Sequence, residues 1–147
     1  MLDSFIRRIQ STRPSVVPLV VRIAAGTVFV AFSIGKFTHH DAEVGALDRY
    51  GIPAPEITTY LVGVLELAGG ILLLLGLLTR PAAAALAGNM VGAIATAGRI
   101  DGGPIHLGLA PALLAAMLFL VWRGGGARSM DLRGSHHPVR EGAPRVA

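Results

Sequence analysis

The sequence lacks cysteine entirely, has a single lysine and is poor in charge. Without cysteine, the chain can form no disulfide, no thiolate nucleophile and no cysteine-ligated metal or iron–sulfur centre. Charged residues make up 15% of the 147 residues, whereas a soluble domain usually carries about a quarter. The charges also gather near the N-terminus, in one loop and in the tail. The long uncharged stretches between them, in a chain that is 52% hydrophobic, predict contact with lipid.

Motifs of the common soluble functions are also missing. The net charge of +4 and the isoelectric point of about 10.7 would suggest nucleic-acid binding in a soluble protein. The basic residues, however, mostly flank apolar segments and form no stripe with aromatic residues, so membrane topology explains them better. No dinucleotide-binding glycine pattern, haem-ligand pair or nucleophilic triad is present. We therefore expect the lipid bilayer as a partner, and no nucleic acid.

Four apolar stretches are long enough to cross a bilayer, which takes about 20 residues as a helix. They cover residues 16–37, 57–78, 81–98 and 105–122, of which the third is rich in alanine and less hydrophobic. The first is too long for a signal peptide and no cleavage site follows it, so we expect it to be retained. Short connections make neighbouring helices antiparallel. The predicted fold is therefore all-α, an integral membrane up-down bundle of four helices.

This pattern divides the chain into three parts. Residues 1–15 form an N-terminal segment, residues 16–123 form the four-helix transmembrane domain, and residues 124–147 form a basic tail. Glycine, arginine, proline and serine dominate the tail, which predicts disorder there.

Glycines predict where the helices approach closely, because membrane helices pack through small residues. The third span contains Gly88 and Gly92, four residues apart. The second span contains two pairs seven residues apart, Gly63 with Gly70 and Gly69 with Gly76. We expect these glycines to lie at helix contacts.

Loop charges predict the orientation in the membrane. The loop after the first span is mainly acidic and carries Asp41, Glu43, Asp48 and Glu56. The N-terminal segment and the tail are mainly basic, and Arg80 lies in the short turn between the second and third spans. Because basic segments tend to stay in the cytoplasm, both termini are expected there. The expected location is a bacterial plasma (inner) membrane.

Three polar side chains fall inside the predicted spans, where an ionisable group is costly unless it is paired or hydrated. From the rise per residue, Arg22, Asn89 and Glu66 lie roughly 9, 12 and 18 Å from the cytoplasmic end. An extended arginine covers much of that gap, so the three can form one buried cluster. The interpretations left open are a structural ion pair that fixes helix register, a quinone, lipid or proton site, and an Arg22 that turns to the cytoplasmic surface without meeting Glu66.

Histidines near the predicted outer face are weaker candidates. His39 and His40 follow Lys36, and His106 opens the fourth span. Imidazoles with carboxylates can bind a metal ion. Adjacent histidines rarely share one ion, however, and no HxH or HxxxH spacing is present, so a solvated loop is favoured and no metal is expected. Lys36 is predicted to anchor the outer end of the first span.

Four sequence strings, taken together, resemble the DoxX family of small bacterial membrane proteins. They are RIAAGTVFVAFSIGKF in the first span, GIPAPE before the second, ELAGGILLLLGLLTR within it and GGGARSMD after the fourth. The resemblance runs from about residue 21 to residue 132. It implies a four-span bundle, and the polar residues that match the family pattern are Arg22, Lys36, Glu66, Ser129 and Asp131.

The resemblance also implies an association with redox systems. Related proteins include a subunit of a thiosulfate:quinone oxidoreductase, and others are linked to a membrane complex that detoxifies radicals. The first expectation is a non-catalytic accessory or anchoring subunit for redox enzymes such as superoxide dismutase or a sulfurtransferase. The alternative is a quinone-interacting oxidoreductase subunit, in which Glu66 and Arg22 bind the head group or relay protons.

A small transporter or lipid-binding protein ranks last, because four short spans leave little room for alternating access. The residues themselves imply no cofactor firmly, and quinone is the cofactor that the alternative function would use. Oligomer formation stays open.

Overall fold

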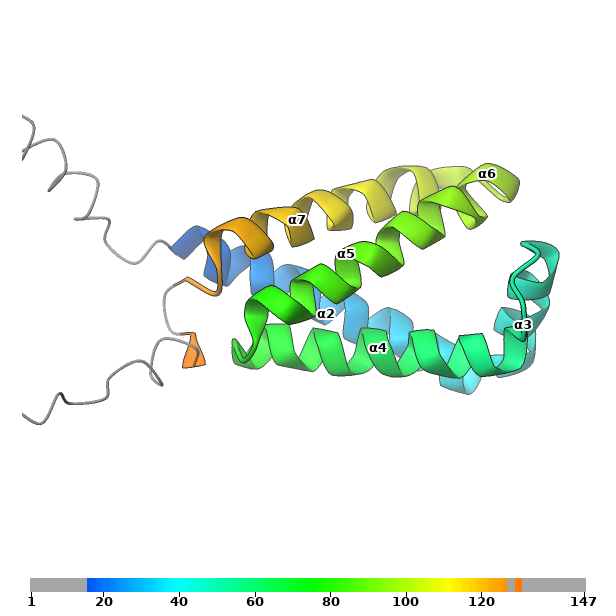
Figure 1. The fold of residues 1–147 in the computed structure, drawn as a ribbon, viewed down its shortest axis with the longest axis horizontal. Coiled ribbons are helices and arrows are strands. Elements are labelled where there is room, and N and C mark those ends of the chain that lie inside the picture. The colour runs from blue at the N-terminus through cyan, green and yellow to red at the C-terminus, as the bar shows by residue number, and fades with distance from the viewer. Residues whose placement is uncertain (1–15, 127–128, 131–147) are drawn as a thin grey trace, which may run out of the picture.

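All regular structure in the described part of the chain is helical (Figure 1). The computed structural model describes residues 16–126 and 129–130. The elements are α2 (Val16–Thr38), α3 (His40–Arg49), α4 (Pro55–Leu75), α5 (Thr79–Ala95), α6 (Ala97–Ile100), the π-helical turn η1 (Ile105–Leu109) and α7 (Ala110–Arg123). The predicted segment 1–15, Asp131 and the tail beyond it lie outside the described residues.

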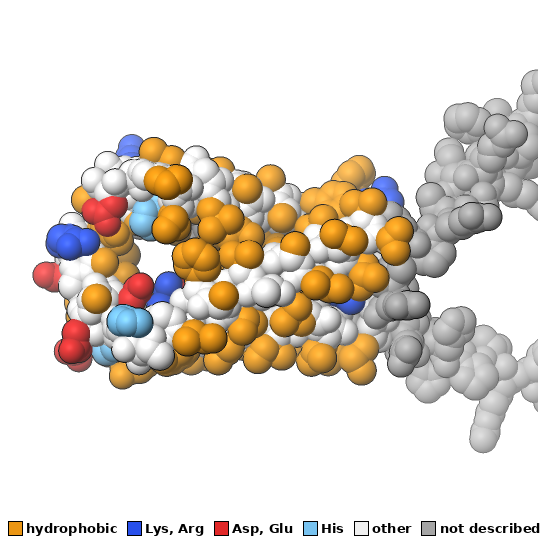
Figure 2. Space-filling view, turned by 180° about the vertical axis from the view of Figure 1, so that it is seen from behind, with side chains coloured by type: hydrophobic (Ala, Val, Ile, Leu, Met, Phe, Trp, Pro, Cys, Tyr) orange, Lys and Arg blue, Asp and Glu red, His pale blue; other side chains and the backbone are white. Residues whose placement is uncertain are grey.

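Four helical stretches are long and apolar enough to span a membrane, which confirms the predicted four-helix bundle. They are Val16–Thr38, Pro55–Leu75, Thr79–Ile100 and Ile105–Arg123. Their outward faces stay apolar, since Leu61 is 64% exposed and Leu118 is 56% exposed. Figure 2 shows apolar side chains over the flanks of the bundle, with charged side chains mainly toward its ends. Lipid is the solvent that suits such a surface.

The bundle consists of two helix pairs (Figure 1). α2 packs along α4, α5 packs along α7, and α4 also contacts α5. The interior is filled by large side chains that are fully buried, namely Phe29, Leu73, Leu86, Met117 and Leu120. α3 stands across one end of the bundle, the end at which α6 also lies. The chain enters α2 and leaves α7 at the other end, as an even number of crossings requires.

Glycine sets the closest helix contact, which lies between α2 and α4. A Cβ atom on Gly26 would lie 2.9 Å from the carbonyl oxygen of Gly70, and a Cβ atom on Gly70 would lie 2.9 Å from that of Gly26. Gly63 lies against the side chain of Phe37 of α2, and Gly69 lies against the side chain of Leu86 of α5. The predicted packing of the second span through its glycines is therefore correct.

The predicted packing through Gly88 and Gly92 is wrong. A Cβ atom on either glycine would meet no atom within 4 Å. Both glycines border a cavity instead. The four-residue spacing places them on one face of α5, but that face does not lie against a neighbouring helix.

Three boundaries differ from those predicted. The loop after the first span contains a helix, α3, whose acidic first turn and final Arg49 both complement the helix dipole. α4 ends at Leu75, earlier than expected, because Gly76 adopts a left-handed conformation with φ of 70°. The third span is interrupted at Thr96, and α6 continues it for one turn.

Candidate functional site

A buried carboxylate, that of Glu66, lies at the centre of the candidate site. Glu66 sits on α4 and is 5% exposed. The Asn89 side-chain amide, on α5, donates a hydrogen bond of 2.8 Å to Glu66 Oε1. Lys36, in the last turn of α2, forms an ion pair in which its Nζ lies 3.3 Å from Glu66 Oε2. Side chains from three helices therefore converge on one carboxyl group.

Lys36 connects this carboxylate with a second one nearer the surface. Its Nζ lies 3.6 Å from an oxygen of Glu43, on α3. The Glu43 side chain is 36% exposed, whereas that of Glu66 is 7% exposed. Negative, positive and negative side chains therefore follow one another from the surface to the interior, in the order Glu43, Lys36 and Glu66.

One carboxylate oxygen of Glu66, Oε2, can accept a further hydrogen bond. Oε2 lies 3.3 Å from the Lys36 ammonium nitrogen, and no other donor among the residues that the structure describes reaches it. A carboxylate oxygen that is buried in this way is normally satisfied by a donor. The site therefore has room for one hydrogen bond from a ligand or a water molecule.

Sequence reasoning missed Lys36 as the partner of Glu66 and assigned it to the outer end of the first span. The close approach at Gly63 brings the two side chains together. A Cβ atom on Gly63 would lie 3.3 Å from the Lys36 Cβ atom, and Gly63 precedes Glu66 by about one helical turn. In the sequence, the glycine one turn before an intramembrane glutamate was the signal that another helix approaches closely at Glu66.

Arg22 lies away from this group. Its Nη1 donates a hydrogen bond of 3.0 Å to the carbonyl oxygen of Gly125, after α7, and its guanidinium packs against Gly76. Gly76 follows Glu66 by ten residues, or about 15 Å along a helix. Side chains on a helix tilt toward its N-terminus, which carries the guanidinium further from Glu66. Of the predicted cluster, the structure brings Glu66 and Asn89 together and places Arg22 at the opposite end.

The segment after α7 covers that opposite end. The Ser129 hydroxyl donates a hydrogen bond of 2.9 Å to the carbonyl oxygen of Gly76, and Ser129 is 1% exposed. Gly125 is also buried. The described part of the tail that was expected to be disordered is therefore packed against the bundle, whereas Asp131 lies outside the described residues.

A cavity of about 430 Å³ opens beside Glu66, between α3, α4, α5 and α6. Polar side chains that line it include Lys36, Tyr50, Thr58, Glu66, Asn89 and Thr96. Gly88 and Gly92, which lack side chains, leave its α5 wall open. In the space-filling view, a hollow is visible at the end where acidic and histidine side chains gather (Figure 2). We call this space the polar cavity.

The ends of α3 and α6 are tied together beside the polar cavity. The Tyr50 hydroxyl donates a hydrogen bond to the Asp101 carboxylate, and Arg49 Nη2 lies 3.6 Å from an oxygen of the same carboxylate. Burial, and then the hydrogen bond to Asp101, raise the pKa of the Tyr50 phenol above its usual value. Tyr50 is therefore a neutral hydrogen-bond donor at physiological pH.

The three histidines that were considered as weak metal ligands make separate contacts. His40 stacks on Tyr60, with ring centroids 4.1 Å apart, and His39 forms a hydrogen bond with Thr38. His106 donates from Nδ1 to the Gly102 carbonyl oxygen at 3.1 Å and lines the polar cavity. Within the described residues, no three side chains of metal-ligating type form a group that could hold an ion.

These features define a small integral membrane protein with four spanning helices and a polar site that is buried near one end. The chain belongs to the DoxX family, whose profile matches residues 17–99. That range contains Lys36, Glu66 and Asn89.

Three relatives illustrate the similarity. The chain is 38% identical to Uncharacterized membrane protein Rv3486 of Mycobacterium tuberculosis, over 88% of this chain and 87% of that protein. It is 28% identical to Inner membrane protein YphA of Escherichia coli, over 84% and 93% of the two chains. It is 30% identical to Putative oxidoreductase CatD of Bacillus subtilis, over 53% of this chain and 57% of that one. No solved structure matches the chain significantly.

Proposed function

We propose that this DoxX protein is a subunit of a membrane oxidoreductase system and binds a quinone-type head group in the polar cavity. The observation that carries the proposal is the buried Glu66 carboxylate, which lines a cavity and whose Oε2 can accept one more hydrogen bond. An inert structural ion pair would need no such space around it. The cavity volume of about 430 Å³ lies in the range of ordinary small-molecule sites, roughly 300–1,000 Å³.

The donors and acceptors around the polar cavity suit a quinone ring. A bound quinone would supply two-electron redox chemistry coupled to protons. Its carbonyl oxygens need a donor, for which the Lys36 ammonium group lines the cavity. The reduced ring carries hydroxyl groups that donate, for which Glu66 Oε2 is the acceptor. Lys36 would hold Glu66 in place while Asn89 occupies its other oxygen.

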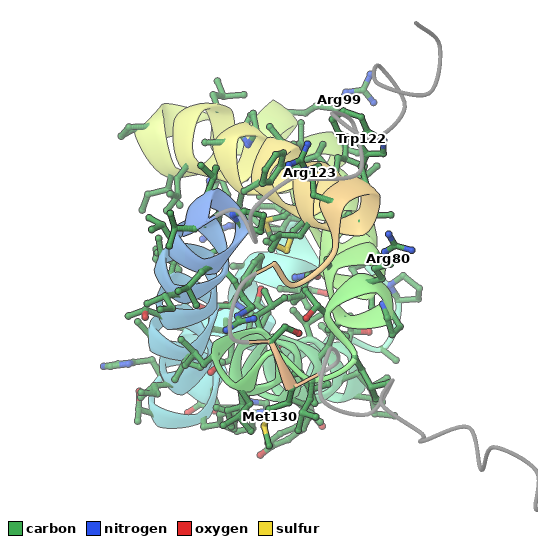
Figure 3. All side chains as sticks on the ribbon, turned by 90° about the vertical axis from the view of Figure 1, so that its left-hand side faces the viewer. Arg80, Arg99, Trp122, Arg123 and Met130 are labelled. Carbon is green, nitrogen blue, oxygen red and sulfur yellow. The ribbon has the colours of Figure 1, made fainter. Side chains whose placement is uncertain are left out.

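Electrons would come from a partner protein, and the lack of cysteine excludes a thiol or a cysteine-ligated iron–sulfur centre of this chain as their source. The relative named Putative oxidoreductase CatD is consistent with a redox setting. The anchoring role, which is the first expectation from the family resemblance, is compatible with this proposal. The end of the bundle opposite the polar cavity presents the exposed Arg80 and Arg123, beside Trp122 (Figure 3). An acidic surface on a redox enzyme is the complement that these arginines favour.

Glu66→Gln should weaken binding of the reduced ring, the quinol, by about tenfold or more, because the hydrogen bond from its hydroxyl group to a charged acceptor is worth roughly 1.5–3 kcal/mol. The measurement is equilibrium binding of decylubiquinol and of menaquinol-4, kept reduced with dithionite, to the purified protein in lipid nanodiscs. Glu56→Gln is the matched control, because it makes the same change on the same helix at an exposed position away from the cavity. Wild-type protein that binds neither quinol, or equal affinities for the two variants, would overturn the proposal.

We further propose that the polar cavity faces the outside of a bacterial plasma membrane. The end that carries it holds five acidic residues, Asp41, Glu43, Asp48, Glu56 and Asp101, and the two arginines Arg49 and Arg99. The opposite end, within the described residues, holds Arg80 and Arg123 and no acidic side chain. The positive-inside rule counts lysine and arginine, and the sequence that adjoins this opposite end adds Arg7, Arg8 and Arg13 before α2 and four arginines after Arg123. This excess favours an orientation with both termini in the cytoplasm.

The natural absence of cysteine makes the orientation simple to test. Gly45→Cys, on α3, should react with a membrane-impermeant maleimide in intact spheroplasts. Arg123→Cys, at the end of α7, should react only after lysis. The reverse pattern would show that the protein is oriented the other way.

A further inference from the structure

A second cavity lies on the other side of the Lys36–Glu66 ion pair. Its volume is about 280 Å³, and apart from the ion pair its walls are mainly apolar. The apolar side chains come from α2, α5 and the fourth span, and include Val28, Phe32, Met90, Ile105, Leu109 and Leu113. We call it the apolar cavity.

The two cavities meet at the same group of residues. Both are lined by Lys36, Glu43, Glu66, Ala93 and His106. The two spaces are therefore adjacent at the ion pair, and a molecule at Glu66 can contact both. A single ligand that occupies both cavities would place its polar part at the ion pair and its apolar part beyond it.

The apolar cavity opens toward lipid. Phe32, from α2, is 44% exposed and Ile105, from η1, is 50% exposed. Both side chains belong to the outward apolar faces of their helices, which lipid surrounds. The polar cavity, by contrast, reaches the ends of α3 and α6, where Tyr50 and Ala97 line it, whereas Glu43 borders both cavities.

We propose that the ligand of this site is an amphiphile, with its polar ring at Glu66 and a flexible apolar chain that leaves through the apolar cavity between α2 and the fourth span. The inference rests on the proposed function and specifies it, because it assigns the route of the chain and the membrane as the source of the ligand. Moving the apolar chain of the ligand from lipid into an apolar cavity removes no apolar surface from water. The chain therefore contributes through shape and contact, and through the concentration of the ligand in the bilayer.

Substitutions on either side of the ion pair separate the two parts of the ligand. Val28→Trp places an indole in the apolar cavity only, whereas Gly92→Leu fills the polar cavity only. Gly35→Leu is the control for the glycine change, because a side chain there meets nothing within 4 Å and Gly35 lines neither cavity. The probes are decylubiquinone and 2,3-dimethoxy-5-methylbenzoquinone, which has the same ring without the long chain.

We expect Val28→Trp to weaken decylubiquinone binding about tenfold and to change binding of the chainless ring by less than about twofold. Gly92→Leu should weaken both, and Gly35→Leu neither. Equal losses of both probes in Val28→Trp would overturn the route of the chain but leave the proposed function intact. Failure of the wild-type protein to bind either probe would overturn both.

A photoreactive probe tests the route without any substitution. Decylubiquinone with a diazirine at the end of its chain should label α2 around Phe32 and the fourth span around Ile105 in wild-type protein. A diazirine-bearing alkane of equal length, without the ring, is the control. Identical labelling by the two probes would mean that an ordinary lipid chain occupies the apolar cavity, and would overturn the proposal.

Discussion

Lys36→Met should lower the free energy of unfolding by about 3–5 kcal/mol, because it strands the buried Glu66 carboxylate without its cation. Asn89 alone would then stabilise that charge among the described residues. Glu66→Leu should cost less, because Lys36 keeps Glu43 as a partner that is nearer to water. The double variant Lys36→Met/Glu66→Leu should recover most of the loss, since a buried ion pair and its apolar replacement are often nearly equal in stability.

Unfolding in mixed micelles, titrated with sodium dodecyl sulfate and followed by circular dichroism, measures these differences. Arg49→Met is the control, because Arg49 and Asp101 form an ion pair in which the arginine side chain is 64% exposed. Such exposed pairs contribute about 0–1 kcal/mol. Two results would each show that Glu66 is not held by this ion pair. One is unfolding of Lys36→Met at the same detergent concentration as Arg49→Met, and the other is a double variant that is as unstable as Lys36→Met.

Gly26→Ala should destabilise the bundle by roughly 1–3 kcal/mol, the usual cost of an added group where the packing cannot yield. Its Cβ atom would lie 2.9 Å from the backbone oxygen of Gly70, and backbone cannot rotate away as a side chain can. α2 and α4 would have to separate. The strain would also reach the candidate site, because the same helix pair brings Lys36 to Glu66.

Gly35→Ala is the matched control for that change. Gly35 lies on the same helix, and a Cβ atom there meets nothing within 4 Å. Alanine is the better helix former by roughly 0.5–1 kcal/mol, so Gly35→Ala should be neutral or stabilising. Both variants gain the same intrinsic helix propensity, and the difference between their unfolding free energies isolates the helix contact. Two equal values would show that α2 and α4 do not depend on this approach.

The four spans were predictable from the sequence because the thickness of a bilayer sets a length that apolar runs either reach or do not. The helix α3 was not, because its ten residues are polar and too few to show a clear period. Its position matters for the candidate site, since α3 supplies Glu43 and part of the polar cavity.

The candidate site was predictable only in part. Polarity inside a span marked Glu66 and Asn89, which do form a hydrogen bond. The partner of Glu66 was missed because depth was counted along separate helices, as if all of them ran straight between the same two planes. The contact at Gly63 depends on how α2 and α4 cross, and sequence spacing does not encode the crossing.

The cavity walls were unpredictable for a related reason. A four-residue glycine spacing marks a smooth helix face, and it does not say whether a neighbouring helix or empty space lies against that face. At Gly26 and Gly70 the face meets backbone, whereas at Gly88 and Gly92 it borders the polar cavity. The same residue type therefore serves close packing on one helix and an opening on another.

The hydrogen bond from Arg22 to Gly125 joins residues 103 positions apart. The first span is synthesised long before Gly125 leaves the ribosome, so the arginine must enter the membrane without this acceptor. The bond can form only once the fourth span has been inserted. Closure of that end of the bundle is consequently a late step of biogenesis, and a nascent chain cut short before Gly125 would never reach it.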